Sequence, residues 1–320
     1  MAELKVGFVG AGNLARQMHY PSVAEIEGAR IVAACDLDEQ RLDEVCQKYG
    51  IEHRYTDYRK MLDEQELDAV FVILRPHHLF DVVADCLERK LPVFTEKPLG
   101  VTSDQARHLA RLAEENGVPT MVGFNRRFIP VLNEAKRRVE QGGEIIQAVS
   151  EFYKLHSGYY YRGAVGVLES DIVHAIDTLR YLVNDRPARN VVSAVGRFYA
   201  RVDNAFCALV EFEGGAIGVL LSNWAVGGRV HRFEVHSKGV SAYIDPETET
   251  HIIANNGREP EVLTTAGAAG SEERRINYGF AGEDAHFIRC LRSGTNPRPS
   301  FADAVHTWEL VDAVRQNRMS

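Results

Sequence analysis

The sequence has no excess of basic residues and no long apolar run. Its 37 lysines and arginines are set against 45 aspartates and glutamates, which gives a net charge of −8 and a pI of about 5.9. Nucleic acids and anionic membranes bind basic surfaces, so neither is an expected partner. No apolar run is long enough to span a bilayer, and no signal peptide precedes the first predicted strand, residues 4–9. We therefore expect a cytoplasmic protein.

Cysteine is scarce as well. The five cysteines are scattered, with no C-x-x-C pair: Cys35, Cys46, Cys86, Cys207 and Cys290. In a chain of 320 residues this spacing indicates reduced, mostly buried thiols, and argues against a disulfide framework or a zinc site. The adjacent His77 and His78 have no carboxylate or cysteine beside them in their loop, so we expect no metal. Length and composition predict an ordinary globular protein of two domains.

A glycine-rich turn follows the first predicted strand. Residues 10–15 read Gly-Ala-Gly-Asn-Leu-Ala, the G-x-G-x-x-A form of a dinucleotide-binding turn. The first glycine makes the tight turn, the second lets the backbone approach a pyrophosphate, and the small alanine allows close helix packing. The next helix presents free N–H groups to the phosphates. The cofactor candidates here are Gly10, Gly12, Asn13 and Leu14.

The second predicted strand, residues 30–35, ends in Asp36, 24 positions after Gly12. A carboxylate at this point accepts hydrogen bonds from the ribose diol of NAD. It would repel the 2′-phosphate of NADP, and no arginine follows immediately, so the sequence favours NAD over NADP. Alternatively, Asp36 caps the helix predicted at residues 39–49, and both roles can hold at once.

Predicted helices and strands alternate through the first 123 residues, which indicates βαβ units and a parallel sheet. The helices are expected at residues 15–25, 39–49, 58–64, 79–90 and 103–116, and the further strands at 69–74, 91–95 and 119–123. Residues 75–78 leave the third strand at the same sheet edge as the glycine turn. We expect a cofactor-binding loop there, with the candidates Leu74, Arg75, Pro76 and His78.

Glu96, Lys97 and Pro98 follow the buried strand at residues 91–95. Ligands of a doubly wound sheet bind just beyond the carboxyl ends of its strands, so Glu96 and Lys97 are expected at the mouth of a cofactor crevice. A lysine there would act as an electrophile or a proton relay. The alternative is a solvated surface ion pair at a strand end.

The second half of the chain offers two candidate substrate segments. Residues 158–163 form a glycine-bounded aromatic loop whose Tyr160 and Tyr161 would stack on a sugar and hydrogen-bond to it, or simply pack as a linker. The helix predicted at 169–182 places Asp171, His174 and Asp177 three residues apart, so neighbours share one face. A carboxylate one turn from an imidazole fixes its tautomer and raises its basicity, as a general base requires. A buried core histidine is the alternative.

The remaining residues predict an α+β domain. A helix is expected at residues 128–142, strands at 144–153, 191–198, 204–212, 216–225, 229–237 and 241–245, and closing helices at 283–292 and 301–315. Glu213-Gly214-Gly215 and Gly227-Gly228 are expected as hairpin turns of an antiparallel meander. Residues 255–275 are polar and glycine-rich and are expected to form a loop.

Taken together, these motifs resemble those of the Gfo/Idh/MocA oxidoreductases. The features that carry the resemblance are the G-x-G-x-x-A start, Asp36, Glu96-Lys97-Pro98, Gly123-Phe124-Asn125-Arg126-Arg127-Phe128 with Pro130, and the helix with His174 and Asp177. The resemblance implies an N-terminal Rossmann domain, with a doubly wound parallel sheet, over residues 1–123. It also implies a substrate-binding and oligomerisation domain with an open-faced mixed sheet over 124–320, whose last helices pack back towards the first domain.

The resemblance further implies an NAD-dependent dehydrogenase that oxidises or reduces a sugar, sugar derivative or cyclitol, assembled as a homodimer or homotetramer. It adds Asn125 to the cofactor candidates and Arg127 and Asp177 to the substrate candidates, with Lys97 and His174 as catalytic residues. The family helix reads Asp-x-Gly-x-His-x-x-Asp, but here Ser170 and Ile172 stand at its first two fixed positions, so Asp171 is expected to replace the aspartate. NAD-dependent glycoside hydrolysis and a catalytically silent NAD- or ligand-binding sensor remain alternatives.

Overall fold

The computed structural model describes residues 3–156 and 165–316. The chain forms two compact units, each built from two stretches of sequence. The first unit contains Met1–Phe124 and Phe280–Val305, and the second contains Asn125–Gly279 and His306–Ser320. Each unit has its own sheet and its own buried core.

The first unit is organised around a parallel sheet, which has six strands within the described residues. The spatial order is β3-β2-β1-β4-β5-β6. The strands are β1 (Leu4–Val9), β2 (Ala29–Cys35), β3 (His53–Tyr55), β4 (Ala69–Val72), β5 (Val93–Glu96) and β6 (Thr120–Gly123). All neighbouring pairs are parallel, and β4, β5 and β6 are buried along their whole length. This order reverses between β1 and β4, which is where a doubly wound sheet binds a nucleotide.

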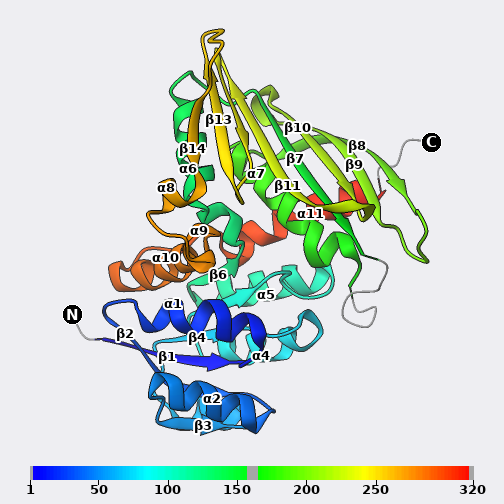
Figure 1. Cartoon of the computed structure of the whole chain (residues 1–320). Helices are drawn as coiled ribbons and strands as arrows, with labels where there is room; N and C mark the ends of the chain where they lie inside the picture. The colour runs from blue at the N-terminus through cyan, green and yellow to red at the C-terminus, as the bar shows by residue number, and fades with distance from the viewer. Residues whose placement is uncertain (1–2, 157–164, 317–320) are drawn as a thin grey trace. The chain divides into compact units, whose positions relative to one another are not determined.

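Helices cover the first sheet, and α1 and α2 pack against each other (Figure 1). They are a π-helical turn η1 (Ala15–His19) that continues into α1 (Tyr20–Ala24), then α2 (Glu39–Tyr49), α3 (Tyr58–Glu64), α4 (Pro76–Glu88), α5 (Ser103–Asn116) and α10 (Phe280–Ser293). Helix α10 comes from the far end of the chain and packs against α1. Stacked phenylalanines from adjacent strands, Phe8 with Phe71 and Phe71 with Phe94, fill the core between the sheet and these helices.

The second unit contains a mixed sheet of eight strands within the described residues, in the order β14-β13-β12-β11-β7-β10-β9-β8. The strands are β7 (Gln147–Leu155), β8 (Ala188–Gly196), β9 (Ala205–Phe212), β10 (Ile217–Asn223), β11 (Ala225–Ser237), β12 (Val240–Ile244), β13 (Glu249–Ala254) and β14 (Glu261–Thr264). Strand β7 pairs parallel with β10 and antiparallel with β11, and the other pairs are antiparallel.

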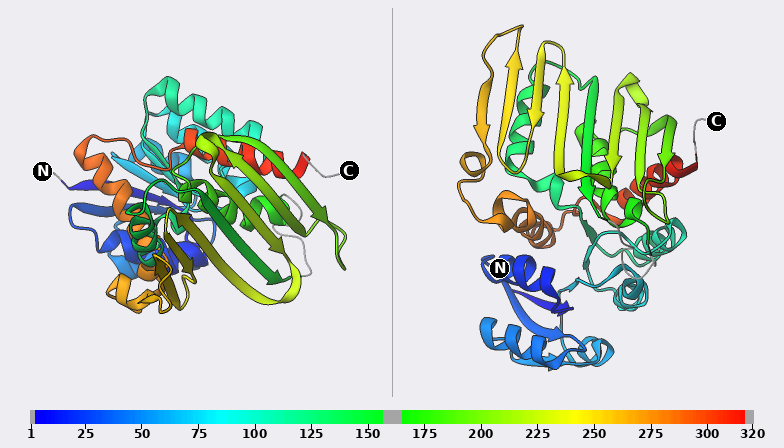
Figure 2. Two further views of the ribbon diagram at one scale, coloured as in Figure 1. Left: turned by 90° about the horizontal axis from the view of Figure 1, so that it is seen from above. Right: turned by 45° about the vertical axis from the view of Figure 1, so that its right-hand side comes forward.

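One face of this sheet is covered by helices (Figure 2). The helices of the unit are η2 (Asn125–Phe128), α6 (Pro130–Glu140), η4 (Leu168–Ile172), α7 (Val173–Leu182), η5 (Glu213–Gly215), α8 (Thr265–Ala269), α9 (Arg274–Asn277) and the greater part of α11 (Phe301–Gln316). Buried and exposed residues alternate along β9, so one row faces the helices and the other faces away from them. The uncovered row includes Leu209, which is 53% exposed.

The predicted fold class is confirmed, but several elements differ from the prediction. Strands β3 and β13 were not expected, and α4 begins at Pro76 and not at residue 79, so residues 76–78 are its first turn. Gly227 and Gly228 lie inside β11, whose neighbour is β7, so they make no hairpin with β10. Residues 255–275 contain β14 and α8 in place of a continuous loop.

Candidate functional site

The glycine turn leaves β1 at the sheet position where the strand order reverses. Gly10 has a φ of +109°, and a Cβ atom there would lie 2.3 Å from the carbonyl oxygen of Ile73, so only glycine fits. A Cβ atom on Gly12 would meet nothing within 4 Å, so this side of the turn is open. The close approach at Gly10 and the open space at Gly12 fit the two roles that a dinucleotide requires of the turn.

Asp36 fixes the glycine turn to the end of β2. One carboxylate oxygen of Asp36 accepts a 2.6 Å hydrogen bond from the Ala11 backbone N–H, and the other accepts one of 2.9 Å from Asp38. The α2 cap is Asp38, whose side chain accepts from the Arg41 N–H at 3.1 Å. The alternative role of Asp36 as the helix cap is therefore wrong, and its carboxylate stands beside the turn, as recognition of a ribose diol requires.

The end of β4 lies next to the glycine turn. The Ile73 N–H donates to the Val9 carbonyl at 2.9 Å, so Leu74 and Arg75 leave the sheet beside Gly10. Arg75 is the N-cap position of α4, and the His78 N–H donates back to the Arg75 carbonyl. The first turn of a helix thus starts at this edge, with Pro76 at its first position.

Glu96 links the buried interior of the first unit to the backbone of Lys97. One oxygen of its carboxylate accepts from the Lys97 N–H at 3.1 Å, and the other lies 3.2 Å from Nε2 of His19. Glu96 is only 4% exposed and His19 is fully buried. Glu96 therefore does not belong to a solvated surface pair, and that alternative is wrong; Lys97 itself is half-buried.

His19 is held between two carboxylates. Its Nδ1 lies 2.9 Å from Asp284 of α10, and its Nε2 faces Glu96. Burial alone lowers the pKa of His19, but the Asp284 and Glu96 carboxylates outweigh it and raise that pKa well above its ordinary value. The imidazolium thus donates to both carboxylates. It connects Asp284 of α10 to Glu96, which in turn accepts from the Lys97 N–H.

Metal-ligating atoms of His19, Glu96 and Glu283 lie within 4.8 Å of one another. Both nitrogens of His19 already contact carboxylates, and a protonated imidazole offers no lone pair to a metal. The imidazolium supplies the positive charge that a cation would bring to this cluster.

The second unit holds His174 on α7. His174 is 5% exposed, and its carbonyl accepts from the Thr178 hydroxyl at 2.8 Å. Asp171, in the π-helical turn η4 that precedes α7, forms an ion pair with Lys154 at the end of β7. The predicted partnership of Asp171 with His174 remains a prediction.

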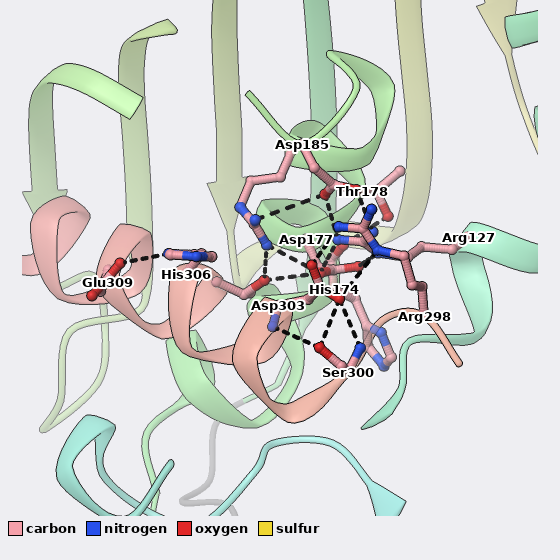
Figure 3. A network of polar contacts seen from close by, with 12 residues as sticks. Arg127, His174, Asp177, Thr178, Asp185, Arg298, Ser300, Asp303, His306 and Glu309 are labelled. Carbon is pink, nitrogen blue, oxygen red and sulfur yellow. Dashed lines mark hydrogen bonds and ion pairs between the residues drawn. The ribbon is translucent and has the colours of Figure 1, made fainter. Parts of the chain in front are cut away.

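Arg127 and Asp177 bind each other. The Arg127 guanidinium donates to both oxygens of Asp177, at 2.7 and 2.8 Å, and to both oxygens of Asp185, at 2.8 and 2.9 Å (Figure 3). Asp177 also accepts from the Thr307 hydroxyl at 2.9 Å. Arg127 and Asp177 are almost fully buried, so this network fixes α7 to η2 and favours a supporting role for both residues.

The structure groups the predicted residues in sets. The glycine turn, Asp36 and residues 74–76 lie at one sheet edge, and Glu96 with Lys97 ends β5 in the same unit; Asp171, His174 and Asp177 lie in the second unit. Asn125 donates to the Tyr278 carbonyl at 2.8 Å. Tyr160 and Tyr161 lie outside the described residues.

Several residues that contact the predicted site residues, or lie beside them, were not predicted from the sequence. They are His19, Asp284, Arg126, Lys154, Asp185 and Tyr278. Asp284 is 265 positions from His19, and no sequence pattern connects the two. Arg126 stands in the segment that carries the family resemblance, but the resemblance gave it no role at a site.

The chain matches two models of one protein family. The model described as "Oxidoreductase family, NAD-binding Rossmann fold" matches residues 4–124, and the model described as "GFO/IDH/MocA C-terminal domain" matches residues 134–242. The first match falls on the glycine turn, Asp36 and Lys97, and the second on the Asp171–Asp177 helix.

The chain is also similar to characterised dehydrogenases. It is 27% identical to the scyllo-inositol 2-dehydrogenase (NAD(+)) of Bacillus subtilis, over 96% of this chain and 92% of that protein. It is 25% identical to the D-apiose dehydrogenase of Paraburkholderia graminis, over 97% of this chain and 86% of that one. The crystal structure of a dehydrogenase from Chromobacterium violaceum matches with a TM-score of 0.90 at 22% identity, covering 99% and 96% of the two chains, and shows the same fold. The protein belongs to the Gfo/Idh/MocA family of NAD-binding oxidoreductases.

Proposed function

We propose that the protein transfers a hydride between NAD and a hydroxyl or keto carbon of a sugar, sugar derivative or cyclitol. Bound NAD supplies the nicotinamide carbon that takes or gives the hydride. The observation that carries the proposal is the anchored Glu96-Lys97 pair at the end of β5, in the unit whose glycine turn and Asp36 fit NAD. The inositol and apiose dehydrogenases among the relatives support the substrate class.

Each catalytic role follows from the chemistry of its side chain. Lys97 would stabilise the negative charge that develops on the substrate oxygen, which is typically worth a few kcal/mol. His174 would take the hydroxyl proton as a general base, with Asp171 as its carboxylate partner. Glu96 would hold Lys97 in place through the backbone hydrogen bond described above.

Replacement of Lys97 by methionine tests the proposal. Lys97→Met keeps the length of the side chain but removes the charge, so we expect turnover to fall at least 1000-fold while the NADH dissociation constant changes less than 3-fold. NADH absorbance during turnover and NADH fluorescence on binding measure the two quantities. A variant that retains more than a tenth of the turnover would show that Lys97 is not catalytic.

The same absorbance assay separates the dehydrogenase from its alternatives. If the protein is a dehydrogenase, at least one compound in a panel of polyols and sugars should be oxidised. The enzyme should then release NADH in proportion to the substrate consumed. Glycoside hydrolysis with tightly held NAD would consume substrate without releasing NADH, and a silent sensor would bind compounds and convert none of them.

We also propose that the protein is a cytoplasmic homodimer or homotetramer that associates through the uncovered face of the second sheet. The exposed apolar side chains of Val192 and Leu209, neighbours on β8 and β9, support this contact. The five free cysteines, of which four are buried, are consistent with a reducing compartment. Among the described residues, no helix is both long enough and apolar enough to cross a membrane. Analytical ultracentrifugation measures the assembly, and a monomer at micromolar concentration would refute it.

A further inference from the structure

Four cationic side chains of the second unit surround a small group of aromatic rings. The guanidinium of Arg126 lies 5.5 Å from the ring of Phe152 and 5.4 Å from that of Tyr278. The ammonium of Lys154 is 5.2 Å from the Phe152 ring. The other two cations are Arg229 and Arg274, at 5.9 and 4.6 Å from the Tyr278 ring. We call these four residues the cationic cluster.

The sheet brings two of these charges together. Phe152 pairs with His231, and Tyr153 pairs with Val230, in the antiparallel ladder of β7 and β11. Lys154 and Arg229 are the next residues along the two strands, where the register of the ladder shifts. The positive charge of Arg229 acts on Lys154 and disfavours its charged form. Burial lowers the pKa of Lys154 most, Asp171 opposes it, and the charges of Arg229 and Arg126 lower the pKa further.

Among the described residues, two carboxylates form ion pairs with these four cations. Asp171 pairs with Lys154, and Glu247 is shared by Arg229 at 3.2 Å and Arg274 at 3.7 Å. Residues 157–164, outside the described part of the chain, contain neither aspartate nor glutamate. The cluster therefore carries an excess of positive charge.

Arg126 is the cation that this arrangement leaves without a carboxylate. It is only 5% exposed, and among the described residues its side chain donates to the Asn125 amide oxygen at 3.1 Å and to no carboxylate. Its Nε–H is buried and has no hydrogen-bond partner there. Buried charges in folded proteins are paired, and the two aromatic faces attract the guanidinium without neutralising it.

His231 presents a second buried donor of the same kind. Arg229 donates to the Tyr278 hydroxyl at 2.8 Å, so that hydroxyl gives its own proton to Nδ1 of His231, also at 2.8 Å. Burial, followed by the charges of the cluster, lowers the pKa of His231 far below its usual value, so the ring is neutral. Its proton is then on Nε2, which is buried without a hydrogen-bond partner in the described residues.

We propose that the cationic cluster binds the anionic group of the substrate, a carboxylate or a phosphate monoester. An anion would neutralise Arg126 and offset the repulsion between Lys154 and Arg229. A guanidinium is suited to either group because its N–H donors match their oxygen atoms in pairs. This inference rests on the proposed hydride transfer and narrows its substrate to an acidic sugar or cyclitol derivative.

The first experiment measures anion binding without turnover. The protein is saturated with NADH, which occupies the cofactor phosphate site, and is titrated with acetate or inorganic phosphate at constant ionic strength set by chloride. Isothermal titration calorimetry should show one site in the millimolar range. Arg126→Gln should weaken the affinity for the anion at least 10-fold, and Arg126→Lys should restore part of that affinity.

Arg197→Gln is the matched control, because Arg197 lies in the same unit, is 59% exposed and pairs with Asp203 outside the cluster. We expect it to bind the anion like the wild type. If Arg126→Gln does not fold, Arg229→Gln replaces it, since the Arg229 side chain is 41% exposed, and a 3- to 10-fold loss is expected. The proposal is overturned if the wild type binds no anion, if the cluster variants bind it unchanged, or if Arg126→Gln weakens NADH binding instead.

The second experiment identifies the anion. NADH formation is compared for D-glucose, D-glucuronate and D-glucose 6-phosphate, and for myo-inositol and its 1-phosphate. At least one acidic member should exceed its neutral partner 10-fold in kcat/KM, and the identity of that member distinguishes carboxylate from phosphate. Higher kcat/KM for the neutral partners would overturn the proposal. If no compound yields NADH, the proposed hydride transfer fails, whereas the titration of Arg126→Gln still decides whether the cluster binds anions.

Discussion

Arg126 and Arg127 are adjacent in the sequence and have opposite surroundings. Arg127 is saturated by Asp177 and Asp185, whereas Arg126 faces aromatic rings and has no carboxylate in the described residues. The sequence resemblance contained both arginines but assigned the substrate to Arg127, because the carboxylates that neutralise Arg127 lie 50 and 58 positions away in the sequence. The chemistry of a charged residue depends on which groups neutralise it, and that is decided by tertiary packing.

His19 gives a prediction at the scale of a single residue. Its raised pKa means that the folded state holds a proton on this imidazole above pH 6.5, where the unfolded state releases it. The stabilisation is complete below pH 6.5 and is lost as the pH rises through the folded pKa. Asp284, whose pKa is raised by burial against the opposing effect of His19, contributes a slope of the same sign.

Replacing His19 by glutamine should lower the free energy of unfolding by about 3 kcal/mol at pH 7, because it leaves two buried carboxylates without a cation. The difference in the free energy of unfolding between this variant and the wild type should narrow between pH 7 and pH 10, as measured by urea denaturation. His306→Gln removes an exposed histidine that pairs with Glu309, and should have little effect. If this difference in the free energy of unfolding stays constant with pH, His19 is neutral in the folded protein.

At the scale of elements, the start of helix α11 is held by reciprocal hydrogen bonds. The Asp303 N–H donates to the Ser300 hydroxyl at 3.2 Å, and the Ser300 N–H donates to the Asp303 carboxylate at 2.8 Å (Figure 3). Arg298 adds a 2.6 Å hydrogen bond to the same carboxylate. Burial alone raises the pKa of Asp303, but these donors outweigh it and lower the pKa to about 2.

We therefore predict that Asp303→Asn destabilises the protein by about 1–2 kcal/mol at neutral pH. The folded pKa is depressed below the ordinary 3.8, so the contribution of Asp303 is present above pH 3.8 and is lost as the pH falls towards 2. Thermal unfolding of the variant and the wild type between pH 7 and pH 3 should show the two curves converging. Asp312→Asn, on the same helix but away from the cap, provides the control, and an equal loss there would contradict the capping role.

The elements that the sequence predicted best are those with strong local signals. Helix α2 has the predicted limits because Asp38 caps it and Gly50 ends it in a left-handed conformation. Strand β3 was missed because it is three residues long and mostly exposed, at the edge of the sheet. Gly227 and Gly228 resemble a hairpin turn locally, but β7 separates β10 from β11, and this long-range pairing has no sequence signal.

At the scale of the whole molecule, the resemblance to a family correctly predicted the fold and the cofactor. The glycine turn, Asp36 and Glu96-Lys97 could be placed from the sequence because the ends of parallel strands meet at one sheet edge. Two other features could not be predicted from the sequence: the contact of His19 with Asp284, and the cationic cluster. Each of them combines residues from distant elements.

The proposed assembly gives a prediction at this scale. Leu209 lies between Val192 and Val219 in a row of apolar residues across β8, β9 and β10 on the uncovered sheet face. A charge there cannot be buried without a partner, so Leu209→Glu should dissociate the oligomer to monomers. Light scattering after size-exclusion chromatography measures the mass.

Tyr199→Glu is the control for that variant, because Tyr199 is 99% exposed and lies in none of the strands. It should leave the mass unchanged. A Leu209→Glu protein with the mass of the wild-type oligomer would place the subunit contact elsewhere.

Residues 280–305 belong to the same unit as the glycine turn, and this has an evolutionary consequence. The nucleotide-binding half cannot be inherited as one contiguous module. A recombination event that exchanged only residues 1–124 between two relatives would bring in His19 without its native Asp284, and β6 without the Pro299 carbonyl that accepts from Val122. Successful chimaeras in this lineage are therefore expected to carry both segments from the same parent.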